Sequence, residues 1–498
     1  MLIKKDKDFL KNYLEDSSNL KGGYVEEVAL PESIEELSIL LKEANSKKIP
    51  VTVSGGGTGT TGSRIPFGGI AISLEKLNRI LEISKEGMYA SLQAGVLVDD
   101  LKKDCDSKGL FYTSHPTEGT ASVGGTIATN ASGARSFKYG PTRDYVRRLK
   151  MVLPSGDVLD IRRGDERLFR GDSRIRLGGG REIVIPLPLY RMPDVKSSAG
   201  YFAKDGMDLI DLFIGQEGTL SVIAEMEVGL VAKPAKIFSS FIFFKTEEDA
   251  WSFAGEARDI SIGSRACGRS SPAIDALSIE YFDSNALGLL RDKNPNVPEN
   301  AKSAIFFEQE ASGKNEDALM EEWLKLMARH NASPDDTWVA MNEKDSARFS
   351  QFRYAIPEAV NDIIRRKGIQ KLSTDIAVPD DKFPEMMRLY TDSLRRCNIE
   401  YVIFGHIGES HVHVNILPGS EEELKKAKEI ALAFIRKGVS LCGTVSAEHG
   451  IGKIKHKFLE EMYGSSGILE MARIKKALDP NCILGLDNIF PREILKLV

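Results

Sequence analysis

Histidines and a carboxylate in the C-terminal part of the chain have the types and spacing of a metal site. His406 and His413 lie in the segment GHIGESHVHVNIL, and Glu448 follows in SAEHGIGKIK. Two imidazoles and one carboxylate suit a zinc or manganese ion and leave positions for substrate oxygens. Histidines on a hairpin are also common as surface or core residues, so the spacing by itself leaves both interpretations open.

Two strands and a turn would have to bring these side chains together. Strand-like residues precede His406, and Val412, Val414 and Ile416 alternate after it. In one uninterrupted strand, His406 and His413 would face opposite sides because their separation is odd. A turn at residues 408–410 would instead let His406 on one strand meet His413 on the next.

A glycine-rich loop near the N-terminus has the composition of a phosphate-binding loop. Five glycines occur between residues 55 and 62, directly after the strand-like run IPVTVS. Such a loop can wrap its backbone N–H groups around a pyrophosphate. The loop contains the string G-x-G-x-x-G at Gly57, Gly59 and Gly62, which in isolation suggests a dinucleotide-binding βαβ unit.

The elements around the glycine loop exclude that unit, because its glycine fingerprint must open a helix. Residues 63–69 are instead turn-rich, and residues 70–74 alternate like a short strand. An amphipathic helix pattern comes before the loop, with apolar residues from Ile34 to Ala44 at helical spacing. The predicted order is therefore helix, strand, glycine loop, strand.

Length and charge are those of a multidomain protein without a nucleic-acid partner. The 498 residues exceed the size of one hydrophobic core, and the net charge of −5 gives no general attraction to nucleic acid. No segment approaches the roughly 20 apolar residues of a membrane span. The five cysteines are isolated, so neither a disulfide framework nor an iron–sulfur motif is visible. We expect a cytoplasmic enzyme, with peripheral contact at the inner face of a membrane left open.

Three segments resemble the flavin-binding domain of the vanillyl-alcohol oxidase superfamily. They are the glycine loop, the run HPTEGTASVGGTIATNASGARSFKYGPTRDYV and the shorter GQEGTLSVI. The resemblance implies FAD held by these residues: Ser54, Gly55, Gly56, Gly57, Thr58, Gly59, Thr60, Thr61, Pro116, Thr117, Gly124, Gly125, Thr126, Ala128, Asn130, Ala131, Gly133, Tyr139, Gly140, Glu217, Gly218, Thr219 and Ile223. Thr58 and its neighbours include no histidine of the kind that attaches flavin covalently in this superfamily, so we expect non-covalent FAD.

The cap segments are similar to those of FAD-linked D-2-hydroxy-acid dehydrogenases. That family includes D-lactate dehydrogenases, the flavin subunit of glycolate oxidase and D-2-hydroxyglutarate dehydrogenase. The resemblance places the divalent metal on His406, His413 and Glu448, and His449 as the catalytic base. Arg353 would bind the substrate carboxylate, and Lys371 is a second candidate for that role. Where the family usually has Asp-Gly-Asn, this chain has Glu409, Ser410 and His411, and His411 is close enough to substitute as a ligand.

The family implies an α+β fold, with a two-subdomain FAD-binding domain and an α+β substrate cap containing an antiparallel sheet. We predict the FAD-binding domain at residues 1–232, the cap at 233–440 and a C-terminal segment at 441–498 that returns to the flavin site. A basic insertion near residues 162–191 carries eight arginines and four acidic residues. We expect it to be turn-rich, and to be either a solvated excursion or a docking patch.

The implied reaction is oxidation of a D-2-hydroxy acid to the 2-oxo acid. Its electrons would pass to a separate acceptor: a quinone, a cytochrome, an electron-transfer flavoprotein or an iron–sulfur subunit. The alternative is a non-redox FAD transferase resembling alkylglycerone-phosphate synthase, and a non-catalytic flavoprotein is the third hypothesis. A homodimer is left open.

Overall fold

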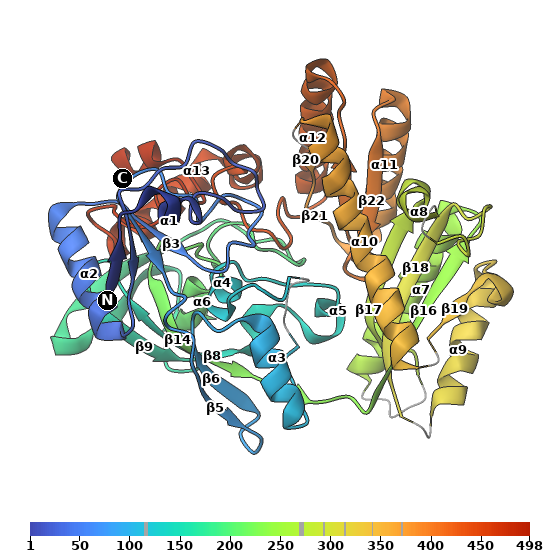
Figure 1. The fold of residues 1–498 in the computed structure, drawn as a ribbon, viewed down its shortest axis with the longest axis horizontal. Helices are drawn as coiled ribbons and strands as arrows, with labels where there is room; N and C mark the ends of the chain where they lie inside the picture. The colour runs from blue at the N-terminus through green and yellow to red at the C-terminus, as the bar shows by residue number, and fades with distance from the viewer. Residues whose placement is uncertain (114–117, 268–272, 292–293, 313–314, 341, 370–371) are drawn as a thin grey trace.

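The computed structural model describes residues 1–113, 118–267, 273–291, 294–312, 315–340, 342–369 and 372–498. The chain folds into two lobes, and both termini lie in the same lobe (Figure 1). Strand β15 (Val231–Ala232) is the last strand of the N-terminal lobe, and β16 (Lys236–Phe244) is the first strand of the cap. No helix within the described ranges is long and apolar enough to cross a membrane.

The first subdomain contains the glycine loop. Helix α2 (Ile34–Lys47) leads into β3 (Val51–Ser54), and β4 (Ile70–Ser73) follows the loop, which confirms the predicted order. Ser33 caps α2 because its side chain accepts a hydrogen bond from the backbone N–H of Glu36. The sheet has the order β1-β2-β4-β3, with β1 (Leu2–Lys4) antiparallel to β2 (Glu27–Leu30) and the remaining pairs parallel.

The second subdomain is a five-stranded antiparallel sheet covered by short helices. Its order is β5 (Ile80–Ser84), β6 (Tyr89–Gln93), β14 (Val222–Gly229), β8 (Val146–Val152) and β9 (Val158–Arg162). Helices α3 (Val98–Ser107), α4 (Val123–Ala128), α5 (Ser136–Tyr139) and α6 (Leu209–Phe213) belong to the same subdomain. Strand β15 pairs with β7 (Leu110–Phe111).

The basic insertion is more regular than predicted. Instead of a turn-rich excursion, it forms the antiparallel hairpin β11 (Gly171–Arg176) and β12 (Glu182–Leu187). Its apolar residues Ile175, Ile185 and Leu187 are buried, and β12 packs against α13 (His456–Leu478). Buried and exposed residues alternate along the hairpin with the period of two that is typical of a half-buried strand. The many arginines and glycines hide this pattern in the sequence. Arg174 and Arg176 both form ion pairs with Glu182, which agrees with the prediction of a solvated segment whose arginines pair with local acidic residues.

The cap is built on an eight-stranded sheet that is buried on both faces. Its main path is β19 (Trp338–Val339), β16, β18 (Ser303–Ala311), β17 (Ala276–Asp283), β22 (Tyr401–Gly405), β23 (His411–Ile416) and β20 (Leu372–Ser373), and β21 (Ile376–Ala377) also pairs with β23. Phe241 and Phe243 belong to one hydrophobic cluster, whereas Ile242 and Phe244 belong to the other. Successive residues of β16 therefore pack on opposite faces of the sheet.

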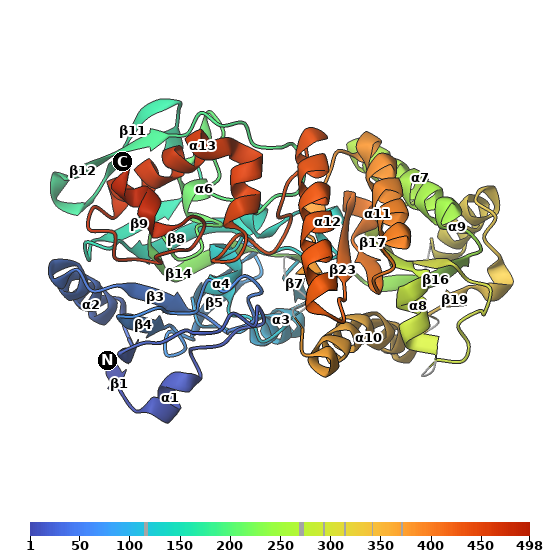
Figure 2. The same cartoon turned by 90° about the horizontal axis from the view of Figure 1, so that it is seen from above.

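Helices cover both faces of the cap sheet, as Figure 2 shows. Helices α8 (Ser284–Arg291) and α10 (Glu343–Lys367) lie on one side. Helices α7 (Glu247–Ala266), α9 (Glu316–Arg329), α11 (Phe383–Cys397) and α12 (Glu421–Ser440) lie on the other. The predicted class, an α+β fold with a two-subdomain first domain and an antiparallel cap sheet, is confirmed.

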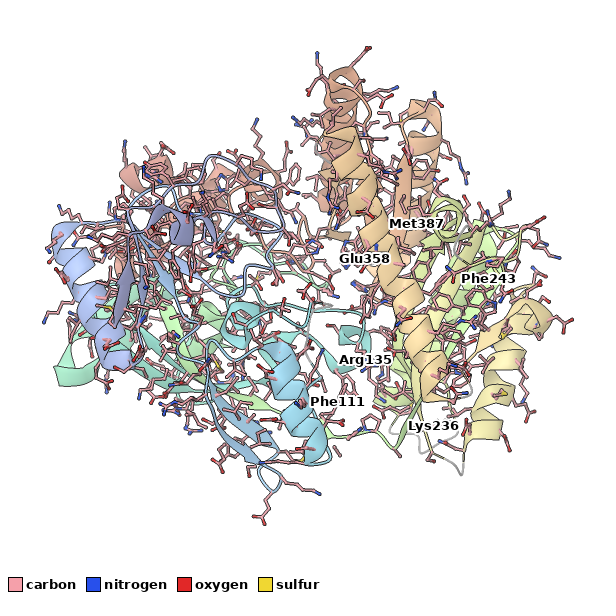
Figure 3. All side chains as sticks on the ribbon, in the orientation of Figure 1. Phe111, Arg135, Lys236, Phe243, Glu358 and Met387 are labelled. Carbon is pink, nitrogen blue, oxygen red and sulfur yellow. The ribbon has the colours of Figure 1, made fainter. Side chains whose placement is uncertain are left out.

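An ion pair joins the two lobes. Arg135 binds the carboxylate of Glu308 through two hydrogen bonds of 2.9 and 2.7 Å. Figure 3 places Arg135 between the lobes, with Phe111 on the N-terminal side. Glu308 belongs to β18, so this bidentate contact ties the second subdomain directly to the cap sheet.

Candidate functional site

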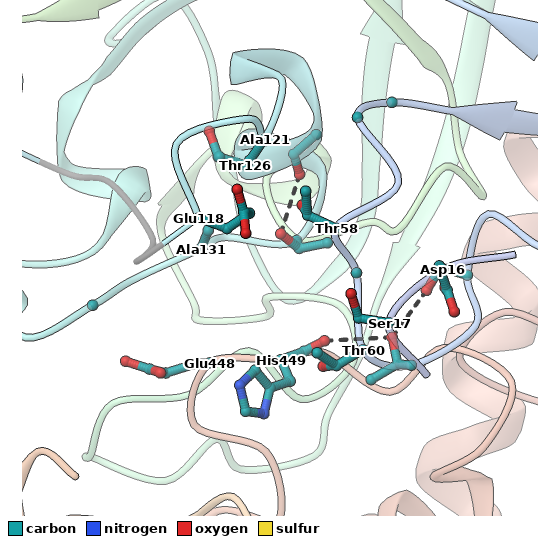
Figure 4. Close-up of a pocket in the computed structure, with 18 of the residues that line it drawn as sticks. Asp16, Ser17, Thr58, Thr60, Glu118, Ala121, Thr126, Ala131, Glu448 and His449 are labelled. Carbon is teal, nitrogen blue, oxygen red and sulfur yellow. Dashed lines mark hydrogen bonds between the residues drawn. The ribbon is translucent and has the colours of Figure 1, made fainter. Parts of the chain in front are cut away.

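One cavity of about 490 Å³ lies where the two subdomains meet the cap. The N-terminal lobe lines it with most of the predicted cofactor residues: Gly55, Gly56, Gly57, Thr58, Gly59, Thr60, Thr61, Gly124, Gly125, Thr126, Ala128, Ala131, Gly133, Glu217, Gly218 and Ile223. In Figure 4, Thr58 and Thr60 of the glycine loop face the same pocket as Thr126, Glu448 and His449. Segments far apart in the sequence thus meet at one site.

Five other predicted cofactor residues do not line the cavity: Ser54, Asn130, Tyr139, Gly140 and Thr219. The Tyr139 hydroxyl donates to Glu310 of the cap, so it serves the contact between the lobes. The Thr219 hydroxyl donates a hydrogen bond of 2.6 Å to the backbone carbonyl oxygen of Gln216. Pro116, Thr117 and Lys371 lie outside the described residues.

Glycines in the walls of the cavity are required by close packing behind the walls, and their lack of side chains leaves main-chain groups open to a flat ligand such as FAD. A Cβ atom on Gly56 would lie 2.5 Å from the carbonyl oxygen of Thr120. A Cβ atom on Gly124 would lie 2.6 Å from the Cβ of Ala94. Larger residues at these positions would push the two wall segments apart. The small residues therefore fit the predicted cofactor.

The cap hairpin, with His406 and His413, and the C-terminal segment, with Glu448, place the predicted metal ligands opposite these walls. Strands β22 and β23 are joined by a turn in which Ser410 adopts a left-handed conformation, with φ of 51°. Nε2 of His406 lies 3.2 Å from Oε2 of Glu448, and Nε2 of His413 lies 3.8 Å from the same oxygen. The turn thus brings His406 and His413 together, as predicted. Two imidazoles and a carboxylate converge, and this donor set fits a divalent metal.

Two residues that the sequence analysis did not select hold this cluster in place. Glu280 of β17 accepts a hydrogen bond of 2.6 Å from Nδ1 of His406. Lys196, in the loop after β12, lies 2.6 Å from Oε1 of Glu448 and also pairs with Glu409. A carboxylate that fixes the second nitrogen of a histidine is a common partner of metal-binding imidazoles.

Burial and charge shape the electrostatics of the cluster. Burial lowers the pKa of His406, but the carboxylates of Glu280 and Glu448 outweigh it and raise the pKa to about 9. Burial raises the pKa of Glu448, but His406 and Lys196 outweigh it and hold the pKa well below its usual range. Glu280 and Glu448 therefore carry negative charge around the imidazole of His406, which favours binding of a cation.

His449 lies beside the cluster with its ring oriented by Asp375. Nδ1 of His449 is 3.3 Å from Oδ2 of Asp375, and the backbone N–H of His449 donates to the same oxygen at 3.0 Å. Lys455 and Ser446 also donate to Asp375, which is buried. A proton on Nδ1 would face the carboxylate and leave Nε2 as a proton acceptor, the arrangement expected of a general base.

Arg353 supplies a cation to the same cavity. It lies on α10 and lines the cavity. Its Nε is 3.3 Å from Oε2 of Glu280, the carboxylate that also holds His406. Within the described part of the chain, its two Nη atoms have no hydrogen-bond partner, so this edge of the guanidinium could bind a substrate carboxylate.

Known proteins match this chain along most of its length. A family model described as "FAD binding domain" matches residues 25–162, and one described as "FAD linked oxidases, C-terminal domain" matches residues 265–486. A D-lactate dehydrogenase of Anaerostipes hadrus is 30% identical over 465 residues, which cover 92% of this chain and 88% of the relative. Glycolate oxidase subunit GlcD of Bacillus subtilis (strain 168) is 28% identical over 476 residues, which cover 95% of this chain and 90% of the relative.

A solved alkyldihydroxyacetonephosphate synthase has a similar fold, with a TM-score of 0.65 over 98% of this chain and 83% of that one. Its 16% sequence identity supports a shared fold alone. The two family models that name FAD cover both the glycine-rich walls and the cap. This chain is an FAD-binding enzyme, and it belongs to the family of FAD-linked D-2-hydroxy-acid dehydrogenases.

Proposed function

We propose that this protein oxidises a D-2-hydroxy acid to the 2-oxo acid, with a divalent metal that orients the substrate and a separate acceptor for the electrons. The observation that carries the proposal is the meeting of His406, His413, Glu448, His449 and Arg353 with the glycine-rich walls in one cavity. Each chemical task of the reaction then has a residue within reach. Zinc and manganese both suit the donor set.

His406, His413 and Glu448 would hold the metal, and the glycine loop with the small-residue wall opposite it would hold FAD. A bound divalent ion supplies a Lewis acid that lowers the pKa of the substrate hydroxyl. Bound FAD supplies the acceptor for the electrons, a role that no side chain can fill. Arg353 binds the substrate carboxylate, which directs the hydroxyl toward His449. His449 accepts the hydroxyl proton at Nε2, while Asp375 keeps the ring in orientation.

Lys371, a second candidate for binding the substrate carboxylate, lies outside the described residues. The acceptor of the electrons is a second protein or a quinone. The relatives are named for different substrates, D-lactate and glycolate. The proposed substrate is therefore a small 2-hydroxy acid, and the length of its side chain has to be determined by experiment.

Anaerobic stopped-flow absorbance tests the function. We expect one of D-lactate, glycolate and D-2-hydroxyglutarate to bleach the flavin band of the metal-loaded protein rapidly, and L-lactate to bleach it far more slowly. The ranking of the acids would report the side chain that the cavity prefers. A flavin band that none of these acids bleaches would contradict the proposal and favour the non-redox transferase.

Arg353→Lys should weaken both substrate binding and chemistry, because lysine keeps the charge but loses the planar fork. Loss of one charge-assisted hydrogen bond corresponds to a fall in kcat/KM of about 10- to 100-fold. Steady-state kinetics with the preferred acid would measure it. Arg348→Lys is a matched control on the same helix, because Arg348 does not line the cavity. Equal kcat/KM for both variants would place the carboxylate elsewhere.

A further inference from the structure

His411, the third histidine of the β22–β23 hairpin, is buried without a well-formed hydrogen bond. Its exposed fraction is 0%, and neither ring nitrogen has a hydrogen-bond partner among the described residues. Nε2 lies 3.0 Å from Oδ1 of Asp375, but the approach is not aligned as a hydrogen bond. Buried polar side chains normally have partners, so this imidazole calls for another explanation.

The geometry of β23 directs His411 toward the metal cluster. His411 and His413 are two residues apart in the same strand, so their side chains lie on the same face of the sheet. Their ring centroids are 4.6 Å apart, and the ring of His406 is 5.4 Å from that of His411. His406, His411, His413 and Glu448 each offer a ligand atom, and these four atoms lie within 4.8 Å of one another.

The partners of the surrounding carboxylates favour this set of four. Lys196 binds Oε1 of Glu448, His406 Nε2 lies 3.2 Å from both carboxylate oxygens, and His413 Nε2 faces Oε2, so Oε2 remains open to a metal. Asp375, His413 and His449 form a second possible group of metal-binding atoms. However, Asp375 Oδ2 already accepts hydrogen bonds from Ser446 Oγ, Lys455 Nζ and the backbone N–H of His449. In the second group, the carboxylate of Asp375 therefore has most of its hydrogen-bonding capacity already in use.

We propose that His411 is a fourth protein ligand of the metal, which makes the site three imidazoles and one carboxylate. The inference rests on the metal of the proposed function and goes beyond it, because the family pattern has an asparagine at this position. Four protein ligands fill the coordination of a tetrahedral ion, whereas a six-coordinate ion keeps two positions for the hydroxyl and carboxylate oxygens of the substrate. The site is therefore built for a six-coordinate ion such as Mn²⁺ rather than for tetrahedral Zn²⁺.

Pulsed EPR of the FAD-containing protein loaded with Mn²⁺ tests this ligand directly, independently of activity. We expect three directly bound imidazole nitrogens in the wild type and two in His411→Asn. Competition with a chelator should show Mn²⁺ affinity lower by at least about 10- to 100-fold in the variant, the loss that even outer partners of ligands produce. Asparagine keeps an amide that can hydrogen-bond Asp375, so a purely structural role of His411 would be preserved. His330→Asn is the control, because His330 pairs with Glu256 away from the cavity.

The nitrogen count in the wild type decides the inference even if His411→Asn folds poorly. Two bound nitrogens in the wild type, or unchanged Mn²⁺ affinity in a folded His411→Asn, would overturn the fourth ligand and leave the metal of the proposed function intact. A wild-type protein that binds no divalent metal would overturn both.

Discussion

His413→Ala is expected to remove the metal from the cavity and to abolish reduction of the flavin by substrate, while FAD stays bound. His413 provides one of the converging imidazoles, and its Nε2 lies 3.8 Å from Glu448. A Lewis acid at the reacting hydroxyl contributes several kcal/mol to the transition state, and about 4 kcal/mol corresponds to about 10³-fold in rate. We therefore expect the rate of flavin reduction to fall at least about 10³-fold, with metal content measured on the same sample.

FAD should stay bound because the proposed FAD site and the proposed metal site are formed by different parts of the chain. The glycine-rich walls belong to the N-terminal lobe, whereas His413 belongs to β23 of the cap. The flavin absorbance per chain should therefore match that of the wild type. His330→Ala removes a histidine from the cap outside the cavity and should keep both metal and turnover. Normal turnover by metal-free His413→Ala would reject the metal in the mechanism.

Local patterns in the sequence, together with the family resemblance, placed most of the wall residues and the proposed metal ligands at one cavity. The glycine loop between β3 and β4 is a contiguous run, and a strand must precede it. His406 and His413 are likewise close in sequence, and only one turn is needed to bring them together. Such features depend on nearby residues and on backbone periodicity, which the sequence displays directly.

The residues that support the ligands could not be found in this way. Glu280 is one of two acidic residues in a strand whose residues are all buried, and it lies 126 positions before the histidine that it binds. Lys196 comes from an irregular loop of the other lobe. Neither has a spacing or a motif that separates it from other charged residues. Glu280 meets His406 only once β17 pairs with β22 in the cap sheet, and Lys196 meets Glu448 only once the chain is folded. A buried charge in a strand pattern was the one available signal for Glu280.

Packing between the lobes also explains why Tyr139, a predicted cofactor residue, does not line the cavity. Its segment resembles a flavin-binding run, yet its hydroxyl donates to Glu310 of the cap rather than facing the cavity. The same short helix, α5, packs against β17. A run of small residues with a few aromatic residues therefore contributes to two surfaces, and the sequence does not show which side chain faces which surface.

His449→Ala is expected to slow reduction of the flavin by about 10²- to 10⁴-fold, the range that general base catalysis contributes. FAD and metal should remain bound, because their proposed ligands are other residues. KM should change less than kcat, since His449 acts on the hydroxyl proton rather than on the carboxylate. Stopped-flow absorbance at saturating substrate would measure the limiting rate.

Chemical rescue separates a base from a residue that merely supports the fold. The side chain of His449 is 33% exposed, so added imidazole can reach the space that the substitution leaves. Imidazole should restore part of the rate in His449→Ala and leave the wild type unaffected. The neighbouring Asp375 would remain fixed by Lys455 and Ser446, so the cavity should keep its shape in the variant. A rate within about tenfold of the wild type, or a slow rate that imidazole does not raise, would assign the proton to another acceptor.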